Sequence, residues 1–287
     1  MLQVARLSRK QLGDSAGLTL SFLKSQINED GGFQDRGGNS DLYYTVFGLE
    51  SFTALSETIP PGPTLDYLRS FGEGANLDFV HVACLARCWA NVSRDLLDVP
   101  RAGILNFIES YRTADGGYNA ARDARHGTVY ACFLALGAYQ DLQCEMPRRA
   151  DLASCIESFR ARDGGYANQP GAAAGLTPPS AAAATLLRQL DQHPDAALGE
   201  WLLARHRPEG GFFASPQTPI PDLLSTATAL HALSGMQLPI NAIREPCLDF
   251  IDSLWTNRGG FYGNWTDDAL DCEYLYYGLL ALGHLSL

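Results

Sequence analysis

The chain has 287 residues, of which 46% are hydrophobic, and a formal net charge of −11. This acidic balance argues against nucleic acid or an anionic membrane as a main partner, because both need basic surface. No apolar run approaches the roughly 20 residues of a membrane span, and the N-terminus lacks the hydrophobic stretch of a signal peptide, so we expect a cytoplasmic protein without a transmembrane segment. Its seven cysteines lack paired spacing, which favours free thiols.

An eleven-residue frame recurs along the chain. In each copy an aliphatic residue stands eight positions before a Gly-Gly pair, and an aromatic residue follows the pair. The copies lie at residues 23–33, 108–118, 156–166, 202–212 and 251–261. Glycine ends helices and turns the chain, so each copy predicts the end of one helix and the turn after it. A repeat of this kind indicates a ring or stack of similar units.

Six stretches of small and apolar residues follow these turns. They lie at residues 41–52, 78–89, 125–136, 179–190, 222–233 and 271–282. They are apolar nearly all round, which is typical of helices buried on both sides, whereas the helices before the turns carry charge on one face. The second hairpin has lost its Gly-Gly pair, and we expect its first helix at residues 63–71. The fold class that follows is all-α, an (α/α)6 toroid of six helical hairpins with an inner and an outer ring.

We expect this toroid to be a single domain over residues 14–287, preceded by an N-terminal extension of residues 1–13. Four of the six inner stretches begin with aspartate, a favoured N-cap that also suits the positive end of the helix dipole. Capping is therefore the simple interpretation of these four residues: Asp41, Asp78, Asp222 and Asp271.

The segment Phe22-Leu23-x-x-Gln26-x-x-x-Asp30-Gly-Gly-Phe33 resembles the QW-type repeat of squalene–hopene cyclases. It is equally similar to the Gly-Gly-Phe repeat of the β subunits of protein farnesyl- and geranylgeranyltransferases. The resemblance covers residues 14–285, and the length matches the single toroid of the β subunits. It implies an aromatic-lined isoprenoid cavity whose mouth is formed by the N-termini of the inner helices. It also implies a zinc ion held by Asp, Cys and His, and docking to a helical-repeat α subunit.

The zinc ligands of the transferases are incomplete in this chain. Asp222 keeps the aspartate, but Leu224 or Ser225 stands at the cysteine position and Tyr274 stands at the histidine position. A neutral phenol is a poor zinc ligand, so we predict no metal at this site. Zinc is the one cofactor that we consider, and a rebuilt site is the alternative, with three ligands: Asp222, Cys272 and Glu273.

A second metal hypothesis concerns His81, Cys84 and Cys88, which share one face of the second inner helix. The three residues span about 10.5 Å along the helix axis, which is too far for a single ion. Buried thiols beside a hydrogen-bonded histidine are therefore the simpler interpretation.

The cyclase motif is incomplete as well. In the resemblance to class II cyclases, the stretch from Asp222 to Leu230 matches DxDDTAxAL, yet Leu224 stands at the position of the proton donor. A relocated acid is the alternative, because one member of a carboxylate pair can have a raised pKa. The candidates for that acid are Asp267, Asp268 and Asp271. From the resemblances to the transferases and to the cyclases, the candidate catalytic residues are Asp222 and Asp271.

The candidate substrate-binding residues fall into three groups. Arg125 and His126 open the third inner stretch and resemble the place where the transferases contact a diphosphate, although surface charge explains them equally well. His81 shares a helix offset with two tyrosines, so these three side chains are expected to reach the same mouth. Further tyrosines are expected to line the cavity. The full set is Tyr43, Tyr44, His81, Arg125, His126, Tyr274 and Tyr277.

The function expected from this set is that of a prenyltransferase β-subunit-like protein that binds a prenyl diphosphate or a similar apolar chain. Whether it transfers that chain is left open by the incomplete zinc site. The alternatives are a terpene cyclase with a relocated carboxylic acid and a non-catalytic module that pairs with a helical-repeat partner. A weaker alternative is carbohydrate chemistry, because some glycosidases also combine six-hairpin barrels with paired carboxylates.

Overall fold

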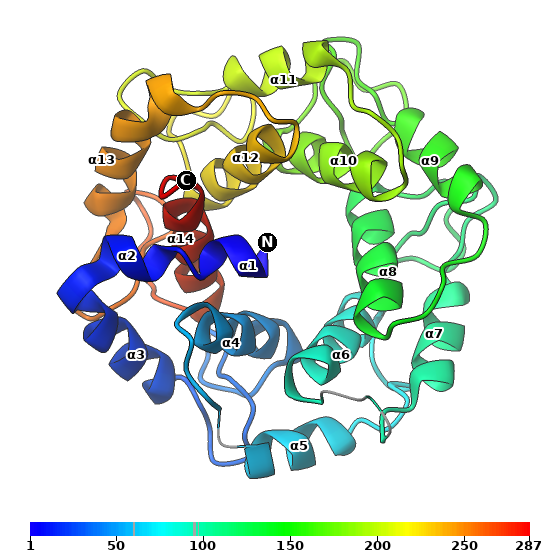
Figure 1. The fold of residues 1–287 in the computed structure, drawn as a ribbon. Coiled ribbons are helices and arrows are strands. Elements are labelled where there is room, and N and C mark those ends of the chain that lie inside the picture. Colours follow the sequence, from blue (N-terminus) through cyan, green and yellow to red (C-terminus); the bar gives the residue numbers. More distant parts are fainter. Residues whose placement is uncertain (60, 94–95, 97) are drawn as a thin grey trace.

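The computed structural model describes residues 1–59, 61–93, 96 and 98–287, and within them the helices form two concentric rings (Figure 1). The inner ring consists of α4 (Leu42–Ala54), α6 (Phe79–Val92), α8 (Val129–Asp141), α10 (Thr177–Gln189), α12 (Leu223–Gly235) and α14 (Cys272–His284). The outer ring consists of α3 (Ala16–Ser25), α5 (Pro61–Arg69), α7 (Arg101–Glu109), α9 (Arg149–Glu157), α11 (Ala196–Leu203) and α13 (Arg244–Leu254). The predicted all-α toroid of six hairpins is confirmed. None of the helices in the described residues is both long and apolar enough to cross a membrane.

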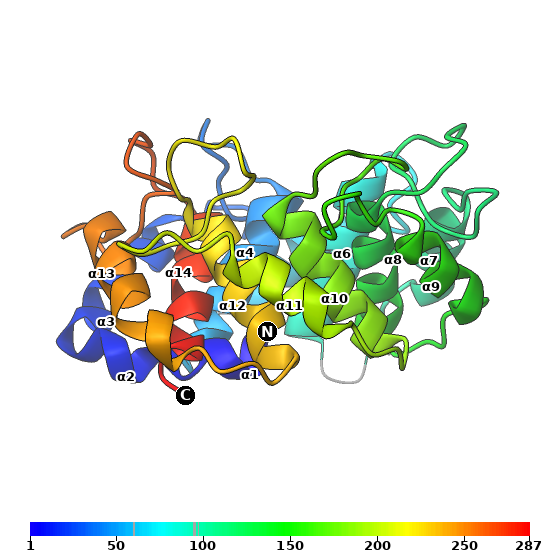
Figure 2. The ribbon, with the colours of Figure 1, turned by 90° about the horizontal axis from the view of Figure 1, so that it is seen from above.

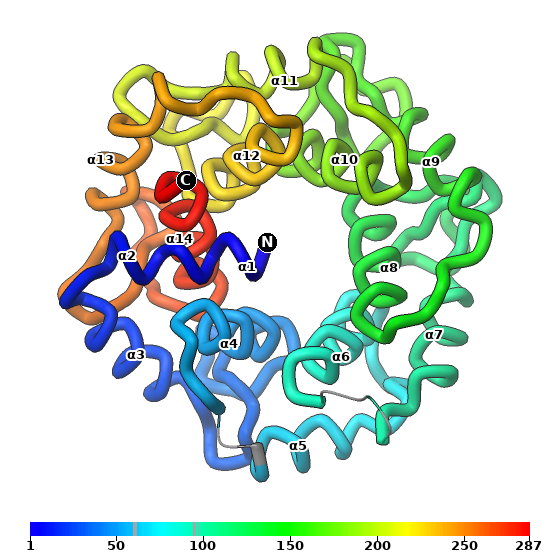
Figure 3. Tube along the Cα trace, in the orientation of Figure 1, coloured from blue at the N-terminus to red at the C-terminus, as the bar shows by residue number. Residues whose placement is uncertain are grey.

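The two faces of the ring differ. The long loops that contain the Gly-Gly turns rise on the face where the inner helices begin (Figure 2). The opposite face carries the ends of the inner helices, both chain termini, and the short helices α1 (Leu2–Ala5) and α2 (Ser8–Leu12). Helix α1 crosses the end of the ring beside α14 and α4 (Figure 3). The boundary between an extension and the toroid at residue 13 stays a prediction.

The first glycine of the Gly-Gly pair is where one hairpin meets the next. Gly31 has φ 89°, and a Cβ there would lie 2.3 Å from the backbone carbon of Pro63 at the start of α5. Gly259 has φ 91°, and its Cβ would lie 2.3 Å from the Leu18 carbonyl oxygen in α3. A side chain is excluded at both positions by the left-handed backbone and by the close approach. The Gly31 turn of the first hairpin therefore packs on the outer helix of the second hairpin, α5. The Gly259 turn of the last hairpin packs in the same way on the outer helix of the first hairpin, α3, and this contact closes the ring.

The aromatic residue of the frame joins the two helices of its own hairpin. Phe33 is fully buried, its N–H donates to Thr45 Oγ1 of α4 at 3.0 Å, and its ring covers Gly48, where a Cβ would lie 2.2 Å away. The third hairpin uses Cys132 Sγ for the same bond to the Tyr118 N–H, at 3.4 Å. The equivalent bonds elsewhere join Tyr166 to Ser180 and Phe212 to Thr226.

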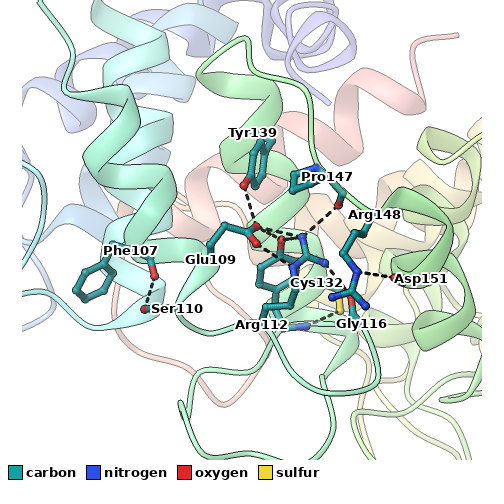
Figure 4. Close-up of polar contacts among 12 residues, drawn as sticks. Phe107, Glu109, Ser110, Arg112, Gly116, Cys132, Tyr139, Pro147, Arg148 and Asp151 are labelled. Carbon is teal, nitrogen blue, oxygen red and sulfur yellow. Dashed lines mark hydrogen bonds and ion pairs between the residues drawn. The ribbon is translucent and has the colours of Figure 1, made fainter.

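A polar network ties the third hairpin together outside the central space (Figure 4). Arg112 Nε donates to Glu109 Oε2 of α7 at 2.9 Å, and the Tyr139 hydroxyl of α8 donates to Glu109 Oε1 at 2.8 Å. Arg112 also donates to the Pro147 carbonyl at 3.2 Å, in the segment that leads to α9. One outer helix, one inner helix and their connection to the next hairpin are thereby linked.

Candidate functional site

The six inner helices enclose a cavity with two adjoining lobes. The larger lobe has a volume of about 320 Å³ and the smaller lobe about 100 Å³. Tyr43, Tyr130, Phe133 and Tyr277 line both lobes, so the two are parts of one space. Every inner helix contributes to this lining, and α10 contributes small and apolar side chains such as Ala182. A cavity of this composition suits an apolar ligand.

Aromatic rings form a continuous wall on the α4 and α14 side. The ring centroids of Tyr43 and Phe47 are 4.9 Å apart, and those of Phe47 and Tyr277 are 5.6 Å apart. The predicted cavity residues Tyr43 and Tyr277 therefore do line the cavity. Faces of such rings pack against alkyl chains and attract cations.

A carboxyl group, Glu273, interrupts this apolar lining. Glu273 lies in the first turn of α14 and lines the larger lobe. The Tyr43 hydroxyl donates to its Oε1 at 2.6 Å. Burial raises the pKa of Glu273, and the nearby charge of Asp271 adds to that effect. The cavity thus contains an acid with a raised pKa and a phenol that orients it, an arrangement suited to proton transfer.

A buried histidine pair lies on another wall of the same lobe. His231 of α12 lines the larger lobe, and its Nδ1 lies 3.0 Å from Nε2 of His284 in α14. Burial lowers the pKa of His231 to about 3 and that of His284 to about 4. Both imidazoles are therefore neutral near pH 7, and one of them donates to the other.

The candidate catalytic aspartates lie at the mouth, where they cap helices. Asp222 Oδ1 accepts from the Ser225 N–H at 2.7 Å, and its Oδ2 accepts from the Ser225 hydroxyl at 2.8 Å. Asp271 Oδ1 accepts from the Tyr274 N–H at 2.9 Å. The same capping is made by Asp41 and Asp78, so the capping interpretation is confirmed for all four residues. Neither Asp222 nor Asp271 is among the residues that line the two lobes.

Arg36 links the two ends of the ring at this mouth. Its Nε donates to Asp271 Oδ2 at 2.7 Å, and its Nη2 donates to Asp267 Oδ2 at 3.0 Å. Its guanidinium carbon lies 5.5 Å from the ring centroid of Tyr274. Burial opposes ionisation of Asp267, but hydrogen bonds from Arg36 outweigh it and lower the pKa of Asp267. The hypothesis of a carboxylate pair with a raised pKa is wrong for Asp267, and Asp268 is exposed outside the cavity.

His81 bridges the caps of two adjacent inner helices. Its Nε2 lies 3.1 Å from Asp41 Oδ2 and its Nδ1 lies 2.9 Å from Asp78 Oδ1. The hydrogen bond with Asp41 is the largest influence on the pKa of His81, which rises to about 9. Burial opposes this rise, and the hydrogen bond with Asp78 adds to it. Tyr44 packs edge-on against Tyr43 at 5.6 Å, close to the charge of Asp271. The predicted rim residues are thus at the mouth, but none of them lines the two lobes.

Arg125 and His126 lie in the loop before α8. The helix begins at Val129 and is capped by Thr128, so the prediction that Arg125 and His126 open it is wrong. Both side chains are exposed, and His126 Nδ1 lies 3.5 Å from Asp115 Oδ2. A carboxylate beside the imidazole weakens it as an anion contact. Their role toward an anionic ligand stays a prediction.

The residues present do not fit the zinc site that the resemblance implies. Across residues 1–59, 61–93, 96 and 98–287, no group of three His, Cys, Asp or Glu side chains could hold a metal ion. In the rebuilt set, Asp222 caps a helix, and burial raises the pKa of the Cys272 thiol well above its usual range. Cys84 and Cys88 are likewise buried thiols with raised pKa values, which makes them poor thiolate ligands.

Two polar cavity residues were not predicted as such from the sequence: His231, and Glu273, which was considered only as a metal ligand. One signal could have found them. The residues that line the lobes recur three, four and seven positions apart along each inner helix, as in Leu224, Thr228 and His231. That spacing marks one face of a helix. The choice of face is what the sequence leaves open, because these helices are apolar nearly all round.

A family model described as the prenyltransferase alpha-alpha toroid domain matches residues 2–71, 63–212 and 180–286. These matches span nearly the whole chain, so the protein belongs to this family. Among solved structures it is similar to protein geranylgeranyltransferase-I from Candida albicans, complexed with GGPP, with 13% identity over 94% of this chain and 90% of the other and a TM-score of 0.70. It is also similar to the type II terpene cyclase MstE from Scytonema, in complex with merosterolic acid A, with 14% identity over 97% of both chains and a TM-score of 0.64.

D-mannose isomerase shares the fold as well, with 11% identity over 97% of both chains and a TM-score of 0.67. At these identities the similarity establishes the toroid and not a reaction. No curated protein matches the sequence.

Proposed function

We propose that this protein binds an isoprenoid that lacks a diphosphate, or a similar apolar chain, in its central cavity. The observation that carries the proposal is the lining itself, which combines aromatic side chains of α4, α8 and α14 with small apolar ones of α10. Burial of a long alkyl chain against such walls is strongly favourable. The structures of two relatives were solved with geranylgeranyl compounds, GGPP and geranylgeranyl dihydroxybenzoate, which supports an isoprenoid as the ligand class.

Charge favours a ligand that lacks a diphosphate over a prenyl diphosphate. The lobes are lined by three carboxyl side chains, Glu50, Asp141 and Glu273, and by two cationic groups, the Arg87 guanidinium and the Met1 amino group. Charges interact strongly in such a poorly solvated space, so a diphosphate would be repelled. Two cationic groups at the mouth are already paired with aspartates: Arg36 with Asp267 and Asp271, and His81 with Asp41 and Asp78.

Ligand binding is tested with geranylgeraniol and GGPP by native mass spectrometry and thermal shift. We expect geranylgeraniol to remain bound and to raise the melting temperature more than GGPP does. Ala182→Trp, which fills the larger lobe, should weaken binding at least about tenfold. The matched control is Ala197→Trp on the exposed face of α11, which should bind as the parent does. Absence of any retained ligand or thermal shift in the parent protein would contradict the proposal.

A second candidate function is rearrangement of the bound chain started by a proton, as in a terpene cyclase with a relocated acid. Glu273 favours it, because this carboxyl faces the larger lobe and accepts from Tyr43. The test is incubation with geranylgeraniol and analysis for cyclic isomers of unchanged mass. Glu273→Gln should lower the rate at least about 100-fold while leaving affinity within threefold. Glu209→Gln, at an exposed site, is the control. Lack of cyclic product from the parent protein would rule out this second function alone.

The resemblance to β subunits also supports pairing with a helical-repeat partner and a cytoplasmic location, and we propose both. Co-purification of such a partner in one-to-one ratio would support the pairing. A tagged chain that elutes alone from its native cells would oppose it.

A further inference from the structure

Three charged side chains meet at the end of the cavity farthest from the loop face. Glu50 of α4, Arg87 of α6 and Asp141 of α8 all line the smaller lobe. They come from the C-terminal parts of their helices, on the side that α1 crosses. Arg87 Nε donates to Glu50 Oε1 at 2.5 Å, and it lies 4.0 Å from Asp141 Oδ2. We call these three residues the inner cluster.

The inner cluster comprises two carboxyl groups and one guanidinium, and the amino group of Met1, which lines the same lobe, adds a cationic group near Glu50. Glu50 has the short contact with the Arg87 guanidinium. Asp141 is left with a contact at 4.0 Å, which is beyond hydrogen-bond distance. Its side chain is 21% exposed, and that exposure faces the lobe that it lines. Asp141 therefore offers the lobe oxygen atoms that can accept hydrogen bonds from a ligand.

A second polar group in the same lobe lacks a partner. Tyr276 of α14 lines the smaller lobe and is 2% exposed. Its hydroxyl has no hydrogen-bond partner among the described residues. Buried polar groups are nearly always hydrogen-bonded in proteins, so an unpartnered phenol that lies near Glu50 and Arg87, in the same lobe as Asp141, points to a group supplied from outside.

We propose that the inner cluster and Tyr276 form a binding site for a hydroxyl or protonated amine at one end of the apolar chain. This proposal rests on the proposed function, since it assumes that the chain occupies the larger lobe. The terminal group would donate to Asp141 and exchange a hydrogen bond with the Tyr276 hydroxyl. The chain would then be oriented with its polar end away from the loop face and its other end toward Glu273.

The experiment compares probes that share one chain and differ at its end. Dissociation constants are measured for geranylgeraniol, geranylgeranylamine, GGPP and the hydrocarbon of the same length. We expect the alcohol and the amine to bind about tenfold more tightly than the hydrocarbon. Asp141→Leu should abolish that advantage for both, whereas Asp141→Asn should keep it for the alcohol and lose it for the amine. Tyr276→Phe should reduce the advantage about threefold.

Thr185→Val provides the matched control, because Thr185 lines the larger lobe alone and its own hydroxyl bonds to the Ala181 carbonyl. It should preserve the preference for the alcohol. Equal affinity of the parent protein for the alcohol and the hydrocarbon would overturn this inference and leave the proposed function standing. The inference would also be overturned if GGPP bound most tightly of the four probes and Arg87→Met lost that binding, because Arg87 would then be the recognising group. Failure of all four probes to bind would overturn both.

Discussion

The two ends of the cavity use the same residue types in opposite ways. At the mouth, carboxylates sit at helix N-termini, where backbone N–H groups and the helix dipole stabilise them, and Asp41 is an example. At the inner end, Asp141 is the last residue of α8, where the dipole disfavours a negative charge. Burial raises the pKa of Asp141 to about 6. Asp41 at the mouth therefore serves the architecture, while Asp141 at the inner end is held in place at a cost in stability, as is common for residues that serve a ligand.

The largest expected effect is at the inner end. Glu50→Leu should lower the free energy of unfolding by about 3 kcal/mol, because it leaves a buried guanidinium without its short contact. Urea denaturation measures this. The double variant Glu50→Leu with Arg87→Met should recover part of the loss, since it removes the unpaired guanidinium but leaves Asp141 without its contact to Arg87. A double variant no more stable than Glu50→Leu alone would show that packing, not charge, explains the loss.

The next effect concerns closure of the ring at the mouth. Arg36→Met should lower the free energy of unfolding by about 2 kcal/mol, because Asp271 is 1% exposed and loses its cationic partner. Arg258→Met, in an exposed loop nearby, should cost less than about 0.5 kcal/mol. The two variants are compared by urea denaturation. Equal stability of both would mean that closure depends on the packing of Gly259 against α3 alone.

A smaller, pH-dependent effect is expected from the His81 bridge. The pKa of His81 in the folded protein is about 9, above the usual value near 6.5. The bridge therefore stabilises the fold fully below pH 6.5, and this stabilisation is lost as the pH rises through 9. After allowance for solvent screening, the free energy of unfolding of the parent protein should exceed that of His81→Asn by about 1 kcal/mol at pH 6. At pH 10 the two free energies should hardly differ. At the acid end the advantage falls again as Asp41, whose pKa is lowered, becomes protonated. A difference that stays constant from pH 6 to pH 10 would contradict this bridge.

The smallest effect is expected outside the cavity. Replacing Arg125 and His126 together by alanine should change the affinity for geranylgeraniol less than twofold, because both side chains are exposed in a loop. Titration calorimetry measures this. A tenfold loss would restore these residues as ligand contacts and would move the polar end of the ligand toward the mouth.

Much of the fold was predictable from local chemistry. The frame that ends at Phe33 and its copies located the turns, and the aspartates located the starts of α4, α6, α12 and α14. The start of α8 was predicted four residues too early, at Arg125 in place of Val129. There the sequence offers polar loop residues and a threonine cap, and the positions before a cap look much like the first turn after it.

The site was less predictable. Tyr43 and Tyr277 were expected in the cavity because they are aromatic and lie on inner helices, and both line it. Glu273 was considered only as a metal ligand, and His231 was not considered. An inner helix that is apolar on every side gives no indication of which face meets the cavity and which meets the outer ring.

By itself, the sequence determined the six hairpins, their order around a ring and the caps that start four inner helices. Each of these depends on a few neighbouring residues, such as a glycine with positive φ or an aspartate that accepts from the next turn. Only the tertiary structure decided which polar groups share the enclosed space. Glu50, Arg87 and Asp141 lie on three different helices, so their convergence depends on ring closure and helix rotation, which are set by packing over the whole molecule.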